Sequence, residues 1–371
     1  MIVKSIAVTG SNGFIGRNLV VRLGELGLNV VPIGRDTDEQ RWRQALSDVD
    51  AVIHLAGANR PTNDAEFMEV NVGVTQKLAE ILLDLGRAVP VIYASTAKAD
   101  DTTEYGRTKR MAEEELQKTL ADTLGGKLYI YRLPNVFGKW ARPNYNSAVA
   151  TFCHNIAHDI PIDIHDPAMP LTLVYVDDVV AEFVATLDKL PAAGFRDVQP
   201  AYVTTVGEVA SIIRGFRHDR AENLIANVGT GLTRALYATY VSALPTDQFS
   251  YEIVSHTDPR GSFSEMLKTR EAGQFSYFTA HPGVTRGGHY HHTKTEKFLI
   301  VHGTARFRFR NILTDQTHEV TTSGDCPVVV ETIPGWSHDV TNVGDDTLVS
   351  LLWANELFDR EKPDTISMKV F

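Results

Sequence analysis

The sequence predicts two domains of different fold class: a doubly wound parallel α/β sheet over residues 1–245, followed by an all-β barrel over residues 246–371. In the first part, short runs rich in Val and Ile alternate with helix-length segments, which is typical of a parallel sheet with helices on both faces. After Leu244-Pro245-Thr246-Asp247, short β-rich runs follow one another without a helical period between them. We therefore place the domain boundary near residue 245.

These runs define the expected elements. Strands of the parallel sheet are expected at residues 5–9, 30–33, 51–56, 90–95 and 127–133, with the first helix at residues 17–26. Strands of the barrel are expected at residues 297–301, 305–310, 327–331 and 347–353.

Composition limits the classes of function. The 371 residues are 43% hydrophobic and 22% charged, as in folded proteins with substantial cores. The formal charge of -10 and the lack of a basic run argue against nucleic acid as a partner. Cys153 and Cys326 have no C-x-x-C spacing, so we expect neither a disulfide framework nor a thiolate zinc site. No apolar run reaches membrane-spanning length, and we expect a cytoplasmic protein without membrane insertion.

A glycine-rich run, TGSNGFIG at residues 9–16, lies between the first strand and the first helix. Glycines here allow a tight turn and a close backbone approach to a diphosphate, whose charge rests on the N–H groups at the start of the helix. The run therefore predicts a dinucleotide-binding fold of the Rossmann type. The residues expected to contact the cofactor are Gly10, Asn12, Gly13, Phe14, Ile15 and Gly16.

The end of the second strand bears on the identity of the cofactor. Gly34 stands where an NAD-binding fold places the carboxylate that holds the ribose 2′-hydroxyl, and Arg35 is suited to pair with the 2′-phosphate of NADP. Asp36, about 20 residues past the last glycine of the run, keeps NAD open. We expect NADPH, with Arg35 as a ligand; a solvated loop charge is the alternative for this side chain.

Tyr105 and Lys109 are four residues apart, so a helix would place them on one face. A nearby ammonium favours the phenolate and would lower the pKa of Tyr105, which suits a proton donor. The pair follows Ser95 and Thr96 at the end of a strand, where a hydroxyl can hydrogen-bond a substrate carbonyl. These residues predict a reductase.

Together these motifs resemble the extended short-chain dehydrogenase/reductase family, most of whose members act on nucleotide sugars. Further runs match in family order: HLAG at 54–57, NVxxT at 71–75, RLPNVFG at 132–138 and YVDD at 175–178. The resemblance implies that Tyr105 is the acid and Lys109 its partner and a ribose ligand. Thr96 would be the catalytic hydroxyl, with Ser95 as the alternative. Implied cofactor contacts are Leu55, Ala56, Gly57 and Leu133, and an implied substrate contact is Asn135. Tyr105 follows Thr96 by only nine positions, which predicts a shortened loop over the nicotinamide.

Histidines gather in the second part of the chain, where seven of the 13 lie between residues 281 and 338. His289 and His291 are expected on one face of a strand, since strand side chains alternate, and Glu296 returns on the next strand. His338 follows a turn further on. Three imidazoles and a carboxylate suit Zn²⁺, Fe²⁺, Mn²⁺ or Ni²⁺, and we expect Zn²⁺. The alternative is a metal-free barrel with histidines at its mouth.

The run from Gly283 to Gly303 resembles the first signature motif of the cupin superfamily, G-x5-H-x-H-x4-E-x6-G. The run PGWSHxxxN at 334–342 resembles the second, with Ile333 where a proline is usual. The resemblance implies a cupin barrel whose metal ligands are His289, His291, Glu296 and His338. The histidines expected outside this ligand set are His292, His302 and His318.

Ahead of the barrel, DPRGSF at 258–263 resembles a segment of deoxysugar-nucleotide epimerases that also use a cupin barrel. Arg260 is suited to bind a diphosphate, because a guanidinium matches phosphate oxygens bidentately. A capping turn is the alternative for this segment.

Nearly the whole chain is similar to the bifunctional capsular-polysaccharide synthesis enzymes of the CapF family and their O-antigen relatives. Further matching runs are HLAGANRP at 54–61, RLPNVFGKWARPNYN at 132–146, HHTK at 291–294 and WANE at 353–356. The resemblance implies a UDP-activated 4-keto deoxy amino sugar as substrate, UDP-2-acetamido-2,6-dideoxy-β-L-arabino-hexos-4-ulose. It implies UDP-N-acetyl-6-deoxy-L-talosamine, a precursor of N-acetyl-L-fucosamine, as product, and a homodimer formed through the cupin domain.

The two chemistries fit one substrate. A C4 ketone makes the C3 proton removable, a metal ion can stabilise the resulting enolate, and a reductase can then deliver hydride to C4. Epimerisation needs the intact ketone, so it must come first. Two alternatives stay open: a redox-neutral epimerase that holds NAD, and a non-catalytic nucleotide-sugar sensor in which the cupin serves for dimerisation.

Overall fold

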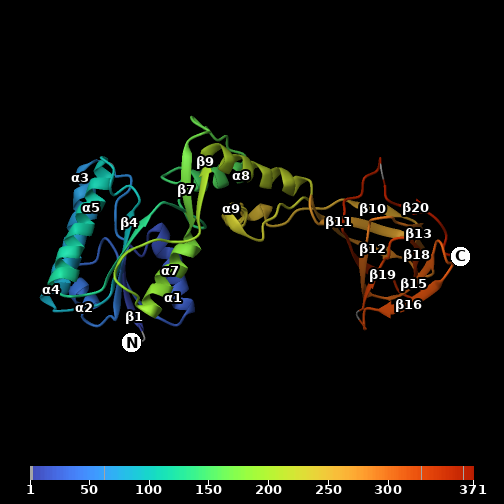
Figure 1. Ribbon diagram of the computed structural model, residues 1–371, viewed down its shortest axis with the longest axis horizontal. Coiled ribbons are helices and arrows are strands. Elements are labelled where there is room, and N and C mark those ends of the chain that lie inside the picture. Colours follow the sequence, from blue (N-terminus) through green and yellow to red (C-terminus); the bar gives the residue numbers. More distant parts are fainter. Residues whose placement is uncertain (1–2, 62, 327, 362) are drawn as a thin grey trace. The chain divides into compact units, whose positions relative to one another are not determined.

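The computed structural model describes residues 3–61, 63–326, 328–361 and 363–371 (Figure 1). The chain forms two compact units. The first runs to Arg214 and also contains Arg234–Pro245, and the second contains Gly215–Thr233 and Thr246–Phe371. A domain boundary near residue 245 stays a prediction. The two units depart from it at residues 215–233, which belong to the second unit.

The segment 215–233 groups with the second unit through specific bonds. Asp219, which is buried, forms an ion pair with Arg270 at 2.7 Å. The N–H of Ile225 donates to the carbonyl of Lys268 at 2.9 Å. Both partners lie far along the chain, so the run of β-rich segments after residue 245 gives no sign of them.

The first unit is built on a six-stranded parallel sheet in the order β2-β1-β3-β4-β5-β8. Its strands are β1 (Ser5–Thr9), β2 (Asn29–Ile33), β3 (Ala51–His54), β4 (Val91–Thr96), β5 (Leu128–Leu133) and β8 (Gly194–Arg196). The strand order reverses at β1, which pairs with β2 on one side and β3 on the other. Ligands of such sheets bind at the carboxyl ends of the strands beside this reversal.

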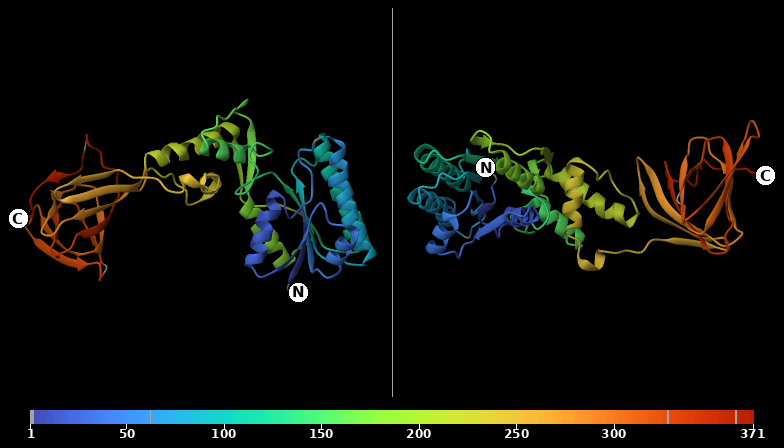
Figure 2. Two further views of the ribbon diagram at one scale, coloured as in Figure 1. Left: turned by 180° about the vertical axis from the view of Figure 1, so that it is seen from behind. Right: turned by 90° about the horizontal axis from the view of Figure 1, so that it is seen from below.

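Helices lie on both faces of this sheet (Figure 2). One face is covered by α1 and α7, with Leu19 and Phe183 in the core, and the other by α2, α4 and α5, with Trp42, Leu78 and Leu116. The helices are α1 (Phe14–Glu25), α2 (Glu39–Ser47), α3 (Ala65–Phe67), the π-helical turn η1 (Met68–Gly73), α4 (Val74–Asp84), α5 (Glu104–Leu116), the π-helical turn η2 (Gln117–Thr123), α6 (Ala148–Ala157), α7 (Val176–Lys189), α8 (Val206–Ala221) and α9 (Gly231–Val241). The doubly wound α/β class is confirmed.

A three-stranded sheet, β6-β7-β9, completes the first unit. Its strands are β6 (Asn135–Phe137), β7 (Pro170–Tyr175) and β9 (Ala201–Thr205). The expected bounds differ in two places that matter for the site. The first helix begins at Phe14, before the expected residue 17, because Gly13 is extended and its carbonyl already accepts the N–H of Arg17 at 2.9 Å. The strand expected at 51–56 ends at His54. Within the described residues, no helix is long and apolar enough to cross a membrane.

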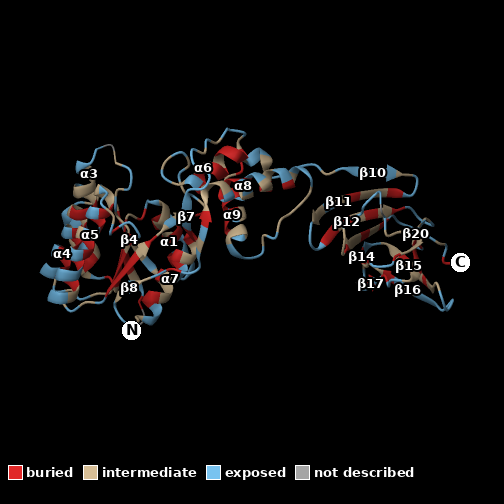
Figure 3. Ribbon diagram, turned by 45° about the horizontal axis from the view of Figure 1, so that its top comes forward, coloured by how far each residue is buried: buried red, intermediate tan, exposed pale blue. Residues whose placement is uncertain are grey.

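The second unit consists of antiparallel strands in two sheets, β10-β11-β12-β19-β14-β17 and β16-β15-β18-β13-β20. Large side chains buried in this unit's core include Phe278, Phe298, Phe307 and Val340, and Figure 3 shows how burial alternates along the strands. The strands are β10 (Ser255–Asp258), β11 (Gly261–Thr269), β12 (Gly273–Ala280), β13 (Thr285–Tyr290), β14 (Glu296–His302), β15 (Thr304–Asn311), β16 (Thr317–Ser323), β17 (Val329–Glu331), β18 (Trp336–Asn342), β19 (Leu348–Ala354) and β20 (Ile366–Ser367), with a short 3-10 helix, η3 (Thr246–Gln248), before them. The all-β cupin-type barrel is confirmed. Pro327, at the start of one expected strand, lies outside the described residues.

Candidate active site and metal centre

The glycine run packs the turn after β1 against the loop after β3. Gly10 has a φ of +66°, and a Cβ there would lie 2.8 Å from the backbone nitrogen of Ala56. A Cβ on Gly16 would lie 2.2 Å from the carbonyl oxygen of Gly10. Gly13 caps the start of α1 without a side-chain bond, so the first N–H groups of that helix have no side-chain acceptor from their own cap. This cradle fits the diphosphate of a nicotinamide dinucleotide.

Arg35 lies just after β2, and 80% of its side chain is exposed. Its guanidinium is 3.7 Å from a carboxylate oxygen of Glu66. Such an exposed ion pair contributes little to stability, so exchanging it for a phosphate would cost little. The geometry is compatible with NADP, and the role of Arg35 stays a prediction.

Helix α5 carries Tyr105 and Lys109 one turn apart and begins at a cap in which the Thr103 hydroxyl accepts the N–H of Gly106 at 3.1 Å. The Lys109 ammonium is buried, donates to the carbonyl of Ala94 at 2.7 Å and lies 4.3 Å from the centre of the Tyr93 ring. Burial lowers the pKa of Lys109 to about 7.

The expected effect of Lys109 on Tyr105 is wrong for this state of the site. Burial raises the pKa of Tyr105 above its ordinary value, and the Thr96 hydroxyl lowers it again in part. The Lys109 ammonium is directed to Ala94 instead of the phenol. Gly57 faces this ammonium, since a Cβ on it would lie 3.6 Å from the Lys109 nitrogen, and the missing side chain leaves room there.

Ser95 and Thr96 point to different partners, as neighbours on a strand should. The Ser95 hydroxyl donates to the buried carboxylate of Glu113. That carboxylate also accepts two hydrogen bonds from the Arg132 guanidinium, one to Oε1 at 3.0 Å and one to Oε2 at 2.7 Å. Ser95 is therefore part of a closed polar cluster, whereas Thr96 is the hydroxyl beside Tyr105.

A buried chain of hydrogen bonds supports the loop after β3. The Thr9 hydroxyl oxygen accepts the N–H groups of Leu55 at 3.1 Å and Ala56 at 3.2 Å, so its own proton goes to Nδ1 of His54 at 2.6 Å. The Thr75 hydroxyl donates to a carbonyl at 2.7 Å, so its oxygen must accept from Nε2 of His54 at 2.9 Å. His54 is thus held neutral with its proton on Nε2, and burial lowers its pKa to about 3.

The other expected cofactor and substrate residues sit at this edge of the sheet. Leu133 ends β5 and is buried, and Asn135 begins β6, where its amide donates to the carbonyl of Thr172 at 3.2 Å. Their contacts with ligands stay predictions.

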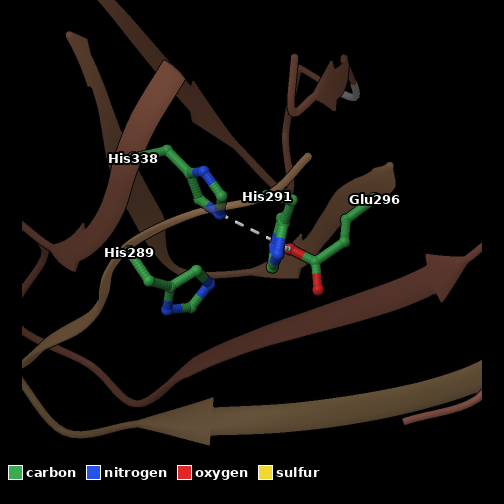
Figure 4. Close-up of side chains that lie close together, drawn as sticks. All are labelled: His289, His291, Glu296 and His338. Atoms are coloured by element: carbon green, nitrogen blue, oxygen red, sulfur yellow. Dashed lines mark ion pairs between the residues drawn. The ribbon is translucent and has the colours of Figure 1, made fainter. Parts of the chain in front are cut away.

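In the second unit, the four expected ligands come together (Figure 4). One ligand atom from each of His289, His291, Glu296 and His338 lies within 4.8 Å of every other. The three imidazole centres are 4.8 to 5.2 Å apart. His289 lies on β13 opposite His338 on β18, Glu296 opens β14, and His291 lies one residue beyond the end of β13 instead of on it.

The protons of two imidazoles point away from the centre of this cluster. Nδ1 of His291 bonds to the carbonyl of Asp364, and Nδ1 of His338 lies 3.3 Å from that of Trp336. A carbonyl only accepts, so each Nδ1 carries the hydrogen, and Nε2 of the neutral ring carries the lone pair.

Both Nε2 atoms are buried and make no hydrogen bond with any described residue, although Glu296 Oε2 is 3.4 Å from one and 3.5 Å from the other. Lone pairs gathered around a carboxylate fit a divalent cation.

The side chains of Arg260 and the remaining histidines contact residues other than the four of this cluster. The Arg260 guanidinium binds Asp258 at 2.5 Å and closes the turn between β10 and β11. This matches the capping turn, and diphosphate binding stays a prediction. The ring of His292 contacts Tyr290, His318 stacks on Phe309, and His302 is exposed.

Two family models match the chain: the NAD dependent epimerase/dehydratase family over residues 6–195 and the polysaccharide biosynthesis C-terminal domain over residues 256–366. A relative from Pseudomonas aeruginosa, UDP-2-acetamido-2,6-beta-L-arabino-hexul-4-ose reductase, is 54% identical over 367 residues, 98% of each chain. The structure of the capsular polysaccharide assembling protein CapF from Staphylococcus aureus is similar with a TM-score of 0.91 at 38% identity, covering 98% of this chain and 100% of that one. CapF with the inhibitor 3-isopropenyl-tropolone has a TM-score of 0.85 at 34% identity, covering 99% and 100%.

The chain belongs to the CapF family. CapF membership makes it an enzyme of polysaccharide biosynthesis, and the epimerase/dehydratase match implies a nicotinamide cofactor. The roles of single residues stay predictions.

The sequence did not predict the contacts of three residues in this CapF-family chain. His54 lies in a matched motif, but its spacing to Thr75 predicts no contact. Lys294, whose ammonium is 3.1 Å from Glu296 Oε1, could have been noticed because it stands two residues from a ligand. Asp364 has no local signal, since it meets His291 across 73 positions.

Proposed function

We propose that this chain first inverts C3 and then reduces C4 of UDP-2-acetamido-2,6-dideoxy-β-L-arabino-hexos-4-ulose. The product would be UDP-N-acetyl-6-deoxy-L-talosamine, on the route to UDP-N-acetyl-L-fucosamine for capsule or O-antigen. The observation that carries the proposal is that one chain holds two separate sets of chemical groups. In the first unit, the Thr96 hydroxyl lies beside the Tyr105 phenol, with Lys109 one turn further along the same helix. In the second unit, three imidazoles surround Glu296, and the buried Nε2 atoms of His291 and His338 have no hydrogen-bond partner among the described residues.

The reduction is assigned to the first unit. NADPH would supply the hydride that C4 receives. The Tyr105 phenol would give its proton to the C4 oxygen, which turns the ketone into an alcohol, and its raised pKa keeps it protonated until then. Thr96 would hold the same oxygen by its hydroxyl. Lys109, whose pKa is about 7, would bind the cofactor ribose beside Gly57.

The epimerisation is assigned to the second unit. Its three imidazoles and Glu296 would hold a divalent cation, most simply Zn²⁺, whose charge would favour loss of the proton next to a carbonyl group. Glu296 is oriented for this by Lys294, which pairs with the carboxylate oxygen not facing the imidazoles. A relative has been solved with a tropolone inhibitor, and the two adjacent oxygens of a tropolone are a chelating pair.

The test is to give the purified full-length protein NADPH and a panel of UDP-4-keto sugars in D₂O. We expect oxidation of NADPH and one deuterium at C3 of the product. Deuterium at C3 without NADPH oxidation would mean a redox-neutral epimerase. Binding of the nucleotide sugar with neither change would mean a sensor.

Variants of the whole chain test this division better than a chain cut after residue 245. Such a cut would remove Arg270 and leave the buried carboxylate of Asp219 without its partner. The homodimer through the second unit is also a proposal, and light scattering of the full chain should give twice the mass of one chain.

A further inference from the structure

The C-terminal segment (residues 363–371) is hydrogen-bonded to the loop that follows His291. The carboxylate of Asp364 accepts three consecutive N–H groups, from His292 at 2.9 Å, Thr293 at 2.7 Å and Lys294 at 2.8 Å. The Thr293 hydroxyl also donates to it, at 3.1 Å. Bonds to a charged acceptor are stronger than neutral ones, so this carboxylate fixes the turn between two candidate ligands, His291 and Glu296.

The backbone of Asp364 acts on one of these ligands directly. Its carbonyl oxygen accepts the Nδ1 hydrogen of His291. This bond sets both the rotation of the ring and the position of its proton, and it turns the Nε2 lone pair toward Glu296. Side chain and main chain of one residue therefore hold the turn and the imidazole together.

The rest of the C-terminal segment bonds to the strands that carry the other two histidines. In β20, Ser367 pairs with His289, and the N–H of Met368 donates to the carbonyl of Gly288 at 2.9 Å. The Met368 carbonyl accepts the hydroxyl of Ser337 at 2.5 Å, and Ser337 precedes His338. The segment thus bonds to the imidazole of His291, pairs with the backbone of His289 and holds Ser337, the residue before His338.

We propose that Asp364 is a positioning residue for metal binding, which holds His291 and the 292–294 turn in place before the ion arrives. The proposal rests on the metal site proposed above. The competing interpretation is that Asp364 only caps a turn and stabilises the fold equally with and without the ion.

The experiment measures Zn²⁺ affinity of the full-length protein by competition with a chromophoric chelator. Asp364→Asn keeps the size of the side chain but removes its charge and replaces one acceptor by a donor. We expect its Zn²⁺ affinity to fall by about 10- to 100-fold. The matched control is Asp359→Asn, an exposed residue ahead of that segment that accepts a single N–H, from Glu361 at 2.8 Å. Its affinity should stay within about twofold of wild type.

A second measurement separates positioning from a cap. Unfolding temperatures are taken with Zn²⁺ and after chelation. If Asp364 positions the ligands, Asp364→Asn reduces the gain that Zn²⁺ gives, and Asp364→Glu, which keeps the charge, restores part of it. If Asp364→Asn lowers both temperatures equally and binds Zn²⁺ as tightly as wild type, the inference is wrong.

Two further outcomes are also decisive. If wild type binds no Zn²⁺ or other divalent ion, the proposed metal site is wrong and this inference is wrong with it. If wild type and Asp364→Asn both bind tightly, only this inference is wrong.

If Asp364→Asn does not fold, Thr293→Val, which removes only the hydroxyl bonds, takes its place. We expect it to release Zn²⁺ several-fold faster than wild type, and an unchanged rate overturns the proposal.

Discussion

The two candidate sites differ in whether their buried polar groups find hydrogen-bond partners within the protein. In the first unit, the buried chain from Thr9 through His54 to Thr75 gives each of its own hydrogens an acceptor, and Lys109 donates to a carbonyl. Beside this chain, the Tyr93 hydroxyl is buried without a hydrogen-bond partner in the described residues. In the second unit, the Nε2 atoms of His291 and His338 are buried without any hydrogen-bond partner in the described residues.

This difference indicates which site should keep its geometry when no ligand or metal ion is bound. A closed chain of hydrogen bonds keeps its geometry without a ligand, whereas buried lone pairs around a carboxylate carry a cost that a cation removes. We therefore expect loss of the cofactor to leave the first unit nearly unchanged, and loss of the metal to weaken the second.

The largest effect is expected from Tyr105→Phe, which removes the transferable proton and little else. NADPH oxidation should fall by about 10²- to 10⁴-fold, with NADPH affinity within about twofold of wild type. Deuterium should still enter C3 of the substrate in D₂O, because the proposed function assigns that exchange to the other unit. Turnover close to wild type would remove Tyr105 from the mechanism, and loss of C3 exchange would break the separation of the two sites.

Metal removal should have the next largest effect. Free Zn²⁺ at 100 times its dissociation constant should add about 2.7 kcal/mol to the unfolding free energy of the second unit. His291→Ala should lose most of this gain and slow deuterium exchange at C3, because three of the four proposed ligands remain. Elemental analysis that finds full metal occupancy in His291→Ala would contradict the ligand set.

Local spacing predicted which residues lie together in each candidate site. Tyr105 and Lys109 follow from the helical period, and His289 and Glu296 from a strand and its tight return. His291 joins them although it lies one residue beyond β13, where the period of a strand does not place it. The glycine run predicted the turn, since Gly10 and Gly16 have no room for a side chain.

What failed depends on burial and on distant contacts. The pKa of Tyr105 rises where a fall was expected, because removal from water outweighs the hydrogen bond with the Thr96 hydroxyl. Ser95 and Thr96 could not be told apart until Glu113 was placed beside the first of them. Contacts across 45 or 73 positions, such as Thr9 with His54 and His291 with Asp364, have no period that a sequence could display.

His54 offers a test of the closed chain. His54→Gln should cost about 1–3 kcal/mol of unfolding free energy at pH 7, because the buried Thr9 hydroxyl loses its acceptor. The folded pKa of His54 is about 3, below the ordinary 6.5, so its contribution is complete above pH 6.5 and is lost as the pH falls toward 3.

The gap between wild type and His54→Gln should therefore narrow on acidification, by up to about 1.4 kcal/mol per pH unit. Urea unfolding of both proteins at pH 7, 6 and 5 measures this. A gap that stays constant or widens would mean that His54 is not held neutral in the folded chain.

The smallest effect is expected from Arg35→Ala, which concerns only the 2′-phosphate. Arg35 is 80% exposed and its ion pair with Glu66 is 3.7 Å long, so the unfolding free energy should change by less than about 1 kcal/mol. The KM for NADPH should rise about tenfold, or about 1.4 kcal/mol of binding, while the KM for NADH stays the same. Arg41→Ala is the matched control, because its side chain is 76% exposed and its own ion pair, with Asp38, is also 3.7 Å long. Both variants lose one positive charge, so only contact with the phosphate separates them. If the two variants had the same KM for NADPH, or if the KM values for NADPH and NADH rose together, Arg35 would be a solvated surface charge. Asp36, whose carboxylate suits the ribose hydroxyl of NAD, would then become the residue to test for cofactor choice.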